Sequence, residues 1–222
     1  TNAELFNTAL ENLTLDKSVI VMWHKEYEIV ASSKYYFYEN AVAQKLALLN
    51  NSVNNQKRDL TDEIQHFEEK YNISFHEEQK NAIINSVNSG VSVITGGPGT
   101  GKTTIIKCII EILKQENQTY MLLAPTGRAS KRLSDSTGEE AKTIHRALEV
   151  ASGELNAINR FVYNENNPFK INAVIVDEVS MVDVAIMNHL CKALPRDCKL
   201  ILVGDKDQLP SVGAGNVLDD II

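Results

Sequence analysis

Cysteine and long apolar runs are scarce in this sequence, and their scarcity narrows the classes of protein that it can encode. The three cysteines, Cys108, Cys191 and Cys198, form no C-x-x-C pair, so neither a disulfide framework nor a zinc cluster is supported. We expect three buried thiols. No apolar stretch has membrane-spanning length and no signal-peptide pattern is present, so we expect a cytoplasmic protein without a membrane partner.

A basic excess is missing as well. The chain has 22 Lys and Arg against 29 Asp and Glu, a formal net charge of -7. Proteins that bind nucleic acid over their whole surface usually carry a basic field, so any contact with nucleic acid must be local. The length of 222 residues suits one large domain with a small appendage.

A glycine-rich loop lies between an apolar run at 91–94 and a predicted helix, and it is the most informative feature of the chain. The loop reads Gly96, Gly97, Pro98, Gly99, Thr100, Gly101, Lys102, Thr103, Thr104. Glycines at this spacing let backbone N–H groups surround phosphates, and Lys102 reaches the β/γ oxygens. Thr103 would hold Mg²⁺, and the helix that follows adds its positive end. The loop therefore predicts a nucleoside triphosphate site.

The first fifty-six residues have a different character and form a predicted accessory segment. Apolar spacing predicts a starting helix, the branched and aromatic runs at 19–23 and 35–38 suggest a β-hairpin, and a second helix follows. This small α+β arrangement resembles a winged-helix remnant. It serves either as a DNA or partner contact or as a simple packing appendage.

The polar stretch at 50–56 is the candidate boundary, which divides the chain into segments 1–56 and 57–222. A helix follows it, with apolar residues at helical spacing from Leu60 to Tyr71. The sequence Ser74-Phe75-His76-Glu77 is typical of a capping box and predicts a further helix that starts at Glu77.

From residue 91 onward, predicted strands and helices alternate. Strands are expected at 91–95, 120–124, 173–176 and 200–203, with amphipathic helices after Lys102, after Thr126 and at 182–190. Near-continuous apolar strands separated by such helices imply a parallel sheet covered on both faces. The predicted fold class is therefore α/β, with the architecture of a RecA-like P-loop NTPase domain.

Two further polar sites follow predicted strands. Asp177 would coordinate the Mg²⁺ shell, and Glu178 would orient and deprotonate the attacking water. On its own, such a pair of carboxylates is better interpreted as part of a solvated turn. Together with the phosphate loop, the catalytic interpretation becomes the stronger one. After the strand at 200–203, Gln208 could sense the γ-phosphate, while Asp205 and Asp207 either contribute or merely shape the turn.

Five motifs together resemble superfamily 1 DNA helicases of the RecD/TraA type. They lie at 96–104, 124–129, 143–146, 176–183 and 204–215. The resemblance covers residues 73–222 well and the first seventy loosely. It implies an ATP-dependent 5′-to-3′ translocase of single-stranded DNA in recombination and repair, with ATP and Mg²⁺ as cofactors. It also implies either the α subunit of an exodeoxyribonuclease V helicase–nuclease complex or a stand-alone relative.

The resemblance also assigns roles to single residues. Gln79 matches the glutamine that reads the adenine edge, where the alternative is an exposed helix glutamine. Thr126 and Arg128 match a motif along the DNA strand, as do Thr143 and His145. The alternative for Arg128 is a charge on a helix surface, and the alternative for His145 is a hydrogen-bonded structural histidine.

One departure from the family lies at the end of the chain. The chain starts at Thr1 and ends at Ile222, where the second RecA-like domain and its catalytic arginines would follow. We therefore expect a fragment that binds nucleotide poorly and hydrolyses it slowly. No nuclease constellation is defensible from the acidic residues. The alternatives are a non-catalytic nucleotide-binding scaffold and another P-loop ATPase, such as an AAA+ loader or a relaxase-linked helicase.

Overall fold

A computed structural model describes residues 2–52, 57–150 and 161–222. Its body contains a five-stranded parallel sheet, with strand order β3-β7-β6-β4-β5. The strands are β3 (Val91–Thr95), β4 (Tyr120–Ala124), β5 (Ala141–Thr143), β6 (Ala173–Val176) and β7 (Lys199–Gly204). Four of these strands were predicted, and β5 was missed.

Helices cover both faces of the sheet, as the sequence predicts. One face packs against α3 (Thr61–Tyr71), α4 (Glu77–Asn88), α5 (Lys102–Gln115) and α6 (Gly127–Thr137). The other packs against α2 (Ser33–Ser52), α7 (Ile144–Leu148), α8 (Val184–Ala193) and α9 (Val217–Ile221). Neighbouring strand residues such as Leu122 and Leu123 enter opposite core clusters, which explains the continuous apolar runs. The RecA-like α/β fold class is confirmed.

Helix α4 starts at Glu77, as predicted, but its cap and the start of α8 differ from the prediction. His76, rather than Ser74, is the N-cap of α4, and its backbone N–H donates to Oε1 of Gln79 at 2.9 Å. The helix predicted at 182–190 begins at Val184, after a 3-10 turn η1 (Val179–Met181), because the Asp183 carboxylate caps it by accepting from the Ile186 N–H at 2.8 Å.

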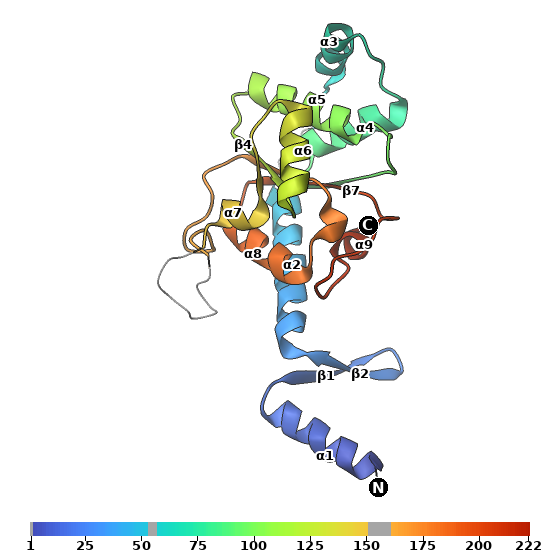
Figure 1. Cartoon of the computed structure of the whole chain (residues 1–222), viewed down its shortest axis with the longest axis vertical. Helices are drawn as coiled ribbons and strands as arrows, with labels where there is room; N and C mark the ends of the chain where they lie inside the picture. Colours follow the sequence, from blue (N-terminus) through green and yellow to red (C-terminus); the bar gives the residue numbers. More distant parts are fainter. Residues whose placement is uncertain (1, 53–56, 151–160) are drawn as a thin grey trace.

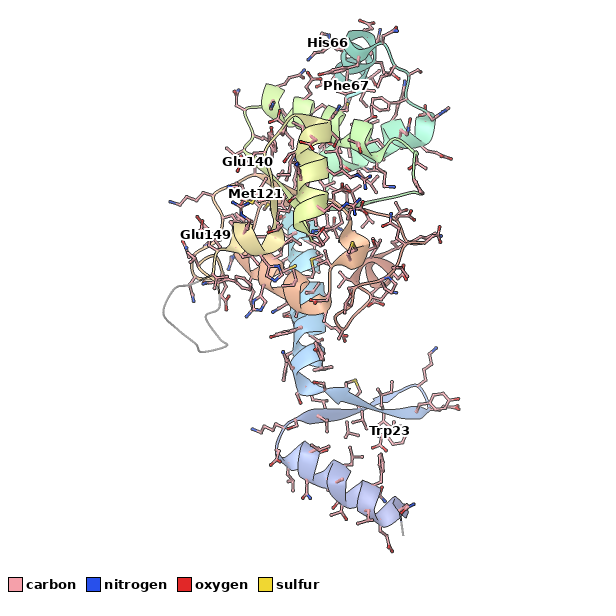
Figure 2. The ribbon with its side chains drawn as sticks, in the orientation of Figure 1. Trp23, His66, Phe67, Met121, Glu140 and Glu149 are labelled. Carbon is pink, nitrogen blue, oxygen red and sulfur yellow. The ribbon has the colours of Figure 1, made fainter. Side chains whose placement is uncertain are left out.

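The N-terminal elements extend away from the body. In Figure 1, α1 (Asn2–Leu15) and the hairpin of β1 (Val19–His24) and β2 (Tyr27–Ser32) lie at one end of the long axis, and α2 runs from them into the body. Figure 2 shows Trp23 on this hairpin, where it is 73% exposed. The small antiparallel element predicted here is therefore present.

The predicted second strand of the hairpin, at 35–38, was wrong. Residues 35–38 belong to α2, where Tyr35 and Tyr38, three positions apart, pack with ring centroids 6.4 Å apart. The hairpin instead turns at Lys25, which has φ +56°, so that β2 follows β1 directly. A run of aromatic residues fits a strand or one side of a helix equally well, and the packing of α2 decides between them.

Helix α2 also shares a core with the sheet. Val42 and Leu49 are buried in the cluster formed with α8. Lys45 Nζ donates to the Leu194 carbonyl oxygen at 2.7 Å, beyond the end of α8. The division of the chain at residue 56 stays a prediction.

Two further predictions from the composition concern the cysteines and membrane-spanning segments. Cys108, Cys191 and Cys198 are all buried and free, as predicted. Burial raises the pKa of each thiol to about 12, so these groups stay protonated at neutral pH. Among the described helices, none is long and apolar enough to cross a membrane.

Candidate functional site

The predicted site residues cluster at the carboxyl edge of the sheet. The phosphate loop follows β3, the Asp177-Glu178 pair follows β6, and the loop that carries Gln208 follows β7. Strands β3 and β6 both pair with β7 in the parallel sheet, so the phosphate loop and the Asp177-Glu178 pair lie on either side of the end of β7. A hydrogen bond from the Gly96 N–H to the Gly204 carbonyl oxygen, at 3.3 Å, ties the loop to the end of β7.

The phosphate loop is held together by its own side chains. Lys102 Nζ donates to the carbonyl oxygen of Gly97 at 2.8 Å and also to that of Gly96. The Thr100 hydroxyl donates to the same Gly97 carbonyl at 2.9 Å. Gly99 and Gly101 have φ values of +76° and +85°, which side chains with a Cβ rarely adopt. The loop therefore needs glycine at these two positions.

Helix α5 starts immediately after the loop. The N–H groups of Thr104 and Ile105 both donate to the Gly101 carbonyl, at 2.9 and 3.0 Å. The Thr103 side chain is half-buried in the first turn, whereas Pro98 lies exposed at the loop tip. The backbone N–H groups that precede those of Thr104 and Ile105 have no acceptor within a helix, and together with the Thr103 hydroxyl they make the start of α5 a setting that favours anions.

Gln79 lies against this loop from α4. Its Nε2 donates to the Thr100 carbonyl oxygen at 2.9 Å. A Cβ on Gly101 would lie 2.6 Å from the same nitrogen, so the close approach also depends on glycine. The residue predicted to read the adenine base is therefore in direct contact with the predicted phosphate site.

The carboxylates that follow β6 lie in a partly enclosed setting. Asp177 Oδ1 accepts the backbone N–H of Glu178 at 2.9 Å. Burial raises the pKa of Asp177, and the negative charge of Glu178 adds to this, while the Glu178 N–H and the charges of Lys102 and Arg132 act in the opposite direction. A cation beside Asp177 would offset the cost of burying this charge.

Gln208 is exposed in the loop after β7, and its neighbour Asp205 organises that loop. Asp205 is 3% exposed; its carboxylate accepts the Asp207 N–H at 3.0 Å, and its carbonyl accepts the Gln208 N–H at 3.2 Å. Asp205 therefore shapes the turn, which was one of the two readings of its sequence position. The structure places Gln208 at the same sheet edge as the phosphate loop, but among the described residues its side chain has no hydrogen-bond partner.

The four residues predicted to contact DNA lie at or just after the carboxyl ends of the neighbouring strands β4 and β5. Thr126 caps α6 by accepting the Ala129 N–H at 3.2 Å, and Thr143 caps α7 by accepting the Arg146 N–H at 3.1 Å. Arg128 is exposed on the first turn of α6. His145 is exposed too, with its ring centroid 6.1 Å from that of Phe161. These residues form a polar surface along the sheet edge.

Sequence reasoning missed one residue that contacts this site, Arg132, and assigned no role to Asp183. Arg132 Nη1 lies 3.8 Å from Glu178 Oε1, across the gap between α6 and the end of β6. Asp183 caps α8 beneath Gly213, where a Cβ would lie 2.2 Å from the Asp183 carboxylate. The only sequence signal for Arg132 is its spacing of four residues from Arg128, which puts both on one helix face.

The chain is similar to proteins of known family. Residues 79–214 match the model of the family described as AAA domain. The RecBCD enzyme subunit RecD of Haemophilus influenzae is 36% identical over 168 residues, which cover 64% of this chain and 26% of that protein. The ATP-dependent RecD2 DNA helicase of Deinococcus radiodurans is 40% identical over 139 residues, covering 63% of this chain and 19% of that protein.

These comparisons confirm the resemblance to RecD-type proteins that the motifs indicate. The chain spans about a quarter of the length of the curated RecD relatives. Among solved structures, a Pif1 helicase from Candida albicans is 28% identical with a TM-score of 0.47, covering 64% of this chain and 34% of that one.

Proposed function

This chain belongs to the family of AAA domains, and on that premise we propose that it is the ATP-hydrolysing domain of a DNA helicase. The observation that carries the proposal is the position of the phosphate loop and the Asp177-Glu178 pair. They follow β3 and β6, on either side of β7, at the carboxyl edge of one parallel sheet. A nucleotide held by the loop would have its terminal phosphate directed toward these carboxylates.

The nucleotide would bind along the loop from Gly97 to Thr104. Lys102 exchanges its contacts with the Gly96 and Gly97 carbonyls for oxygens of the β- and γ-phosphates. Gln79, which already contacts the loop, reads the edge of the adenine base. Backbone N–H groups of the loop and of the first turn of α5 supply the remaining donors.

The residues present fit a magnesium ion. The Thr103 hydroxyl and the Asp177 carboxylate are hard oxygen ligands of the kind that Mg²⁺ prefers. The raised pKa of Asp177 also means that a nearby cation would be stabilising. When bound, the ion neutralises charge that develops on the phosphate oxygens.

Glu178 acts as the general base in this proposal. Its carboxylate orients a water molecule and accepts the proton as the water oxygen attacks the γ-phosphorus. Gln208, in the loop after β7, responds to loss of the γ-phosphate and changes the conformation of the neighbouring strand ends. The hydrogen bond between Gly96 and Gly204 supports this coupling because it joins the two loops.

Single-stranded DNA would lie along the carboxyl ends of β4 and β5. The hydroxyls of Thr126 and Thr143, whose oxygens cap their helices, retain protons that can be donated to phosphates. Arg128 and His145 supply further exposed donors. The resemblance of the five motifs leads us to propose 5′-to-3′ movement in DNA recombination and repair. One relative is named as a subunit of the RecBCD enzyme and another as a RecD2 DNA helicase, so both a complex subunit and a stand-alone helicase remain candidates.

The test is ATP hydrolysis by the intact protein with and without single-stranded DNA. We expect DNA-stimulated turnover that Lys102→Ala abolishes, while Lys107→Ala, in the same helix α5, remains near wild type. Unwinding of duplexes with 5′ or 3′ tails then tests direction. Nucleotide binding without hydrolysis in either condition would favour the non-catalytic scaffold, and equal turnover by wild type and Lys102→Ala would reject the site.

A further inference from the structure

Arg132 makes an unusual contact for an exposed helix residue. Its side chain is 81% exposed, yet its Nη1 lies 3.8 Å from Oε1 of Glu178, whose side chain is only 21% exposed. The guanidinium also acts electrostatically on Asp177, where it opposes the rise in pKa caused by burial. Within the described residues, this is the one ion pair that involves either carboxylate of the candidate site.

The pair is easy to exchange. An ion pair between a strongly exposed arginine and a carboxylate contributes little to stability, and a separation of 3.8 Å is at the long end of such contacts. Moving the Arg132 side chain also disrupts little packing, because most of that side chain is in solvent. A phosphate offers the guanidinium a stronger, bidentate partner than a single carboxylate oxygen at this distance.

Helix α6 connects this pair to the proposed DNA surface. The helix begins after its cap Thr126, and Arg128 and Arg132 lie four positions apart, on the same helix face. Four residues of helix rise about 6 Å, which is close to the spacing of successive phosphates in a nucleic-acid strand. A strand that contacts Arg128 therefore brings a phosphate within reach of Arg132.

We propose that Arg132 is a positioning residue that makes ATP hydrolysis depend on single-stranded DNA, by holding Glu178 aside until a DNA phosphate takes the guanidinium. This inference deepens the proposed function and rests on it. Released, the carboxylate of Glu178 accepts a proton from the attacking water. The water oxygen bonds to the γ-phosphorus, and the bond from that phosphorus to the β–γ bridging oxygen breaks, its electron pair leaving with ADP.

The backbone at Glu178 is consistent with a side chain that has two positions. Glu178 has φ +55°, in the left-handed region that residues with a Cβ rarely adopt. Such conformations persist only where the surroundings hold them. Here the Glu178 N–H is fixed on Asp177 Oδ1, so the main chain stays in place while the carboxylate changes partner.

The experiment compares ATP turnover of the intact protein in the absence and presence of a saturating oligothymidylate. We expect Arg132→Ala to raise turnover without DNA several-fold and to lower the stimulation ratio by a similar factor, with KM for ATP unchanged. Arg132→Lys keeps the positive charge but loses the bidentate guanidinium, so its turnover without DNA should lie between those of the wild type and Arg132→Ala. Lys131→Ala, the exposed neighbouring residue, is the matched control and should behave as wild type.

Two results would overturn this inference. One is an unchanged rate without DNA together with an unchanged stimulation ratio in Arg132→Ala. The other is an equal fall of both rates, which indicates a structural role; Arg132→Gln and thermal unfolding check that the fold is retained. Absence of turnover by the wild-type protein would overturn the proposed function as well, whereas normal wild-type turnover with an unaltered Arg132→Ala removes this inference alone.

Discussion

Gln79 Nε2 donates to the carbonyl oxygen of Thr100 across 2.9 Å, which joins helix α4 to the phosphate loop. The Oε1 atom of the same side chain accepts the His76 N–H, also at 2.9 Å. One amide therefore caps the helix and braces the loop. Its donor is shared between the loop and any base that binds there, so loop geometry and base selectivity depend on a single side chain.

Changing Gln79 should separate these two functions. We expect Gln79→Ala to weaken ATP binding about tenfold, or about 1.4 kcal/mol, and to reduce the preference for ATP over GTP. Gln79→Glu keeps an acceptor for the His76 N–H, because either residue type completes a capping box, but it loses the amide donor. It should therefore lose selectivity while retaining helix stability. Competition of ATP and GTP against a fluorescent nucleotide measures both, and unaltered selectivity in Gln79→Ala would reject the assignment.

Thr126 combines a structural role with its proposed role at DNA. Thr126→Ala removes the oxygen that accepts the Ala129 N–H, which should cost about 1 kcal/mol and lower the Tm by about 2 to 4 °C. It should also weaken binding of labelled single-stranded DNA, measured by fluorescence anisotropy. Thr126→Ser keeps the hydroxyl and is the control for both effects. A lower Tm with unchanged DNA affinity would leave Thr126 as a helix cap alone.

Much of the fold could be predicted because local pattern and tertiary setting agree. The runs at 120–124 and 173–176 are apolar throughout, and the run at 91–95 is apolar apart from Ser92 and Thr95, which fits strands whose two faces are both covered by helices. Prediction failed where the local pattern was ambiguous or too short to indicate one type of element. The aromatic run at 35–38 is compatible with either period, and β5 has only three residues, too few for any periodicity.

The clustering of the site also followed from the sequence, since carboxyl ends of parallel strands meet at one edge. What could not be predicted is which side chains touch across that edge. The contact of Arg132 with Glu178 joins residues on different elements, and no local pattern encodes the 3.8 Å between them. The roles of Lys102, of Glu178 and of the residues expected to contact DNA stay predictions.

Leu48 and Leu49 test whether helix α2 is part of the folded body or of a separate N-terminal unit. Leu49 is fully buried, whereas Leu48 is 66% exposed. We expect Leu49→Ala to lower the free energy of unfolding by about 2 to 5 kcal/mol and Leu48→Ala to change it by about 0.5 kcal/mol or less. Urea unfolding measures both. Equal, small effects would support a domain boundary at residue 56, because α2 would then contribute little to the stability of the sheet.

We expect the buried carboxylate of Asp177 to lower the stability of the folded protein at pH 7. Because burial raises its pKa above the ordinary value of 3.8, the folded protein binds this proton more tightly than the unfolded chain. The contribution of the group is therefore most favourable below pH 3.8, falls as the pH rises through the folded-state pKa, and is constant above it. Asp177→Asn removes the charge and should stabilise the protein by roughly 1 kcal/mol at pH 7.

The gain from Asp177→Asn should shrink as the pH approaches 4, where the wild-type carboxyl becomes protonated, and ATP hydrolysis should be lost at every pH. Urea unfolding at pH 7 and pH 4 gives the two stability differences, and Asp135→Asn, on the exposed face of α6, is the control for a surface carboxylate. A variant less stable than wild type at pH 7 would contradict the prediction. It would mean that the attraction of Lys102 and Arg132 for the ionised carboxylate exceeds the cost of its burial, which is the opposite balance to the one that raises its pKa.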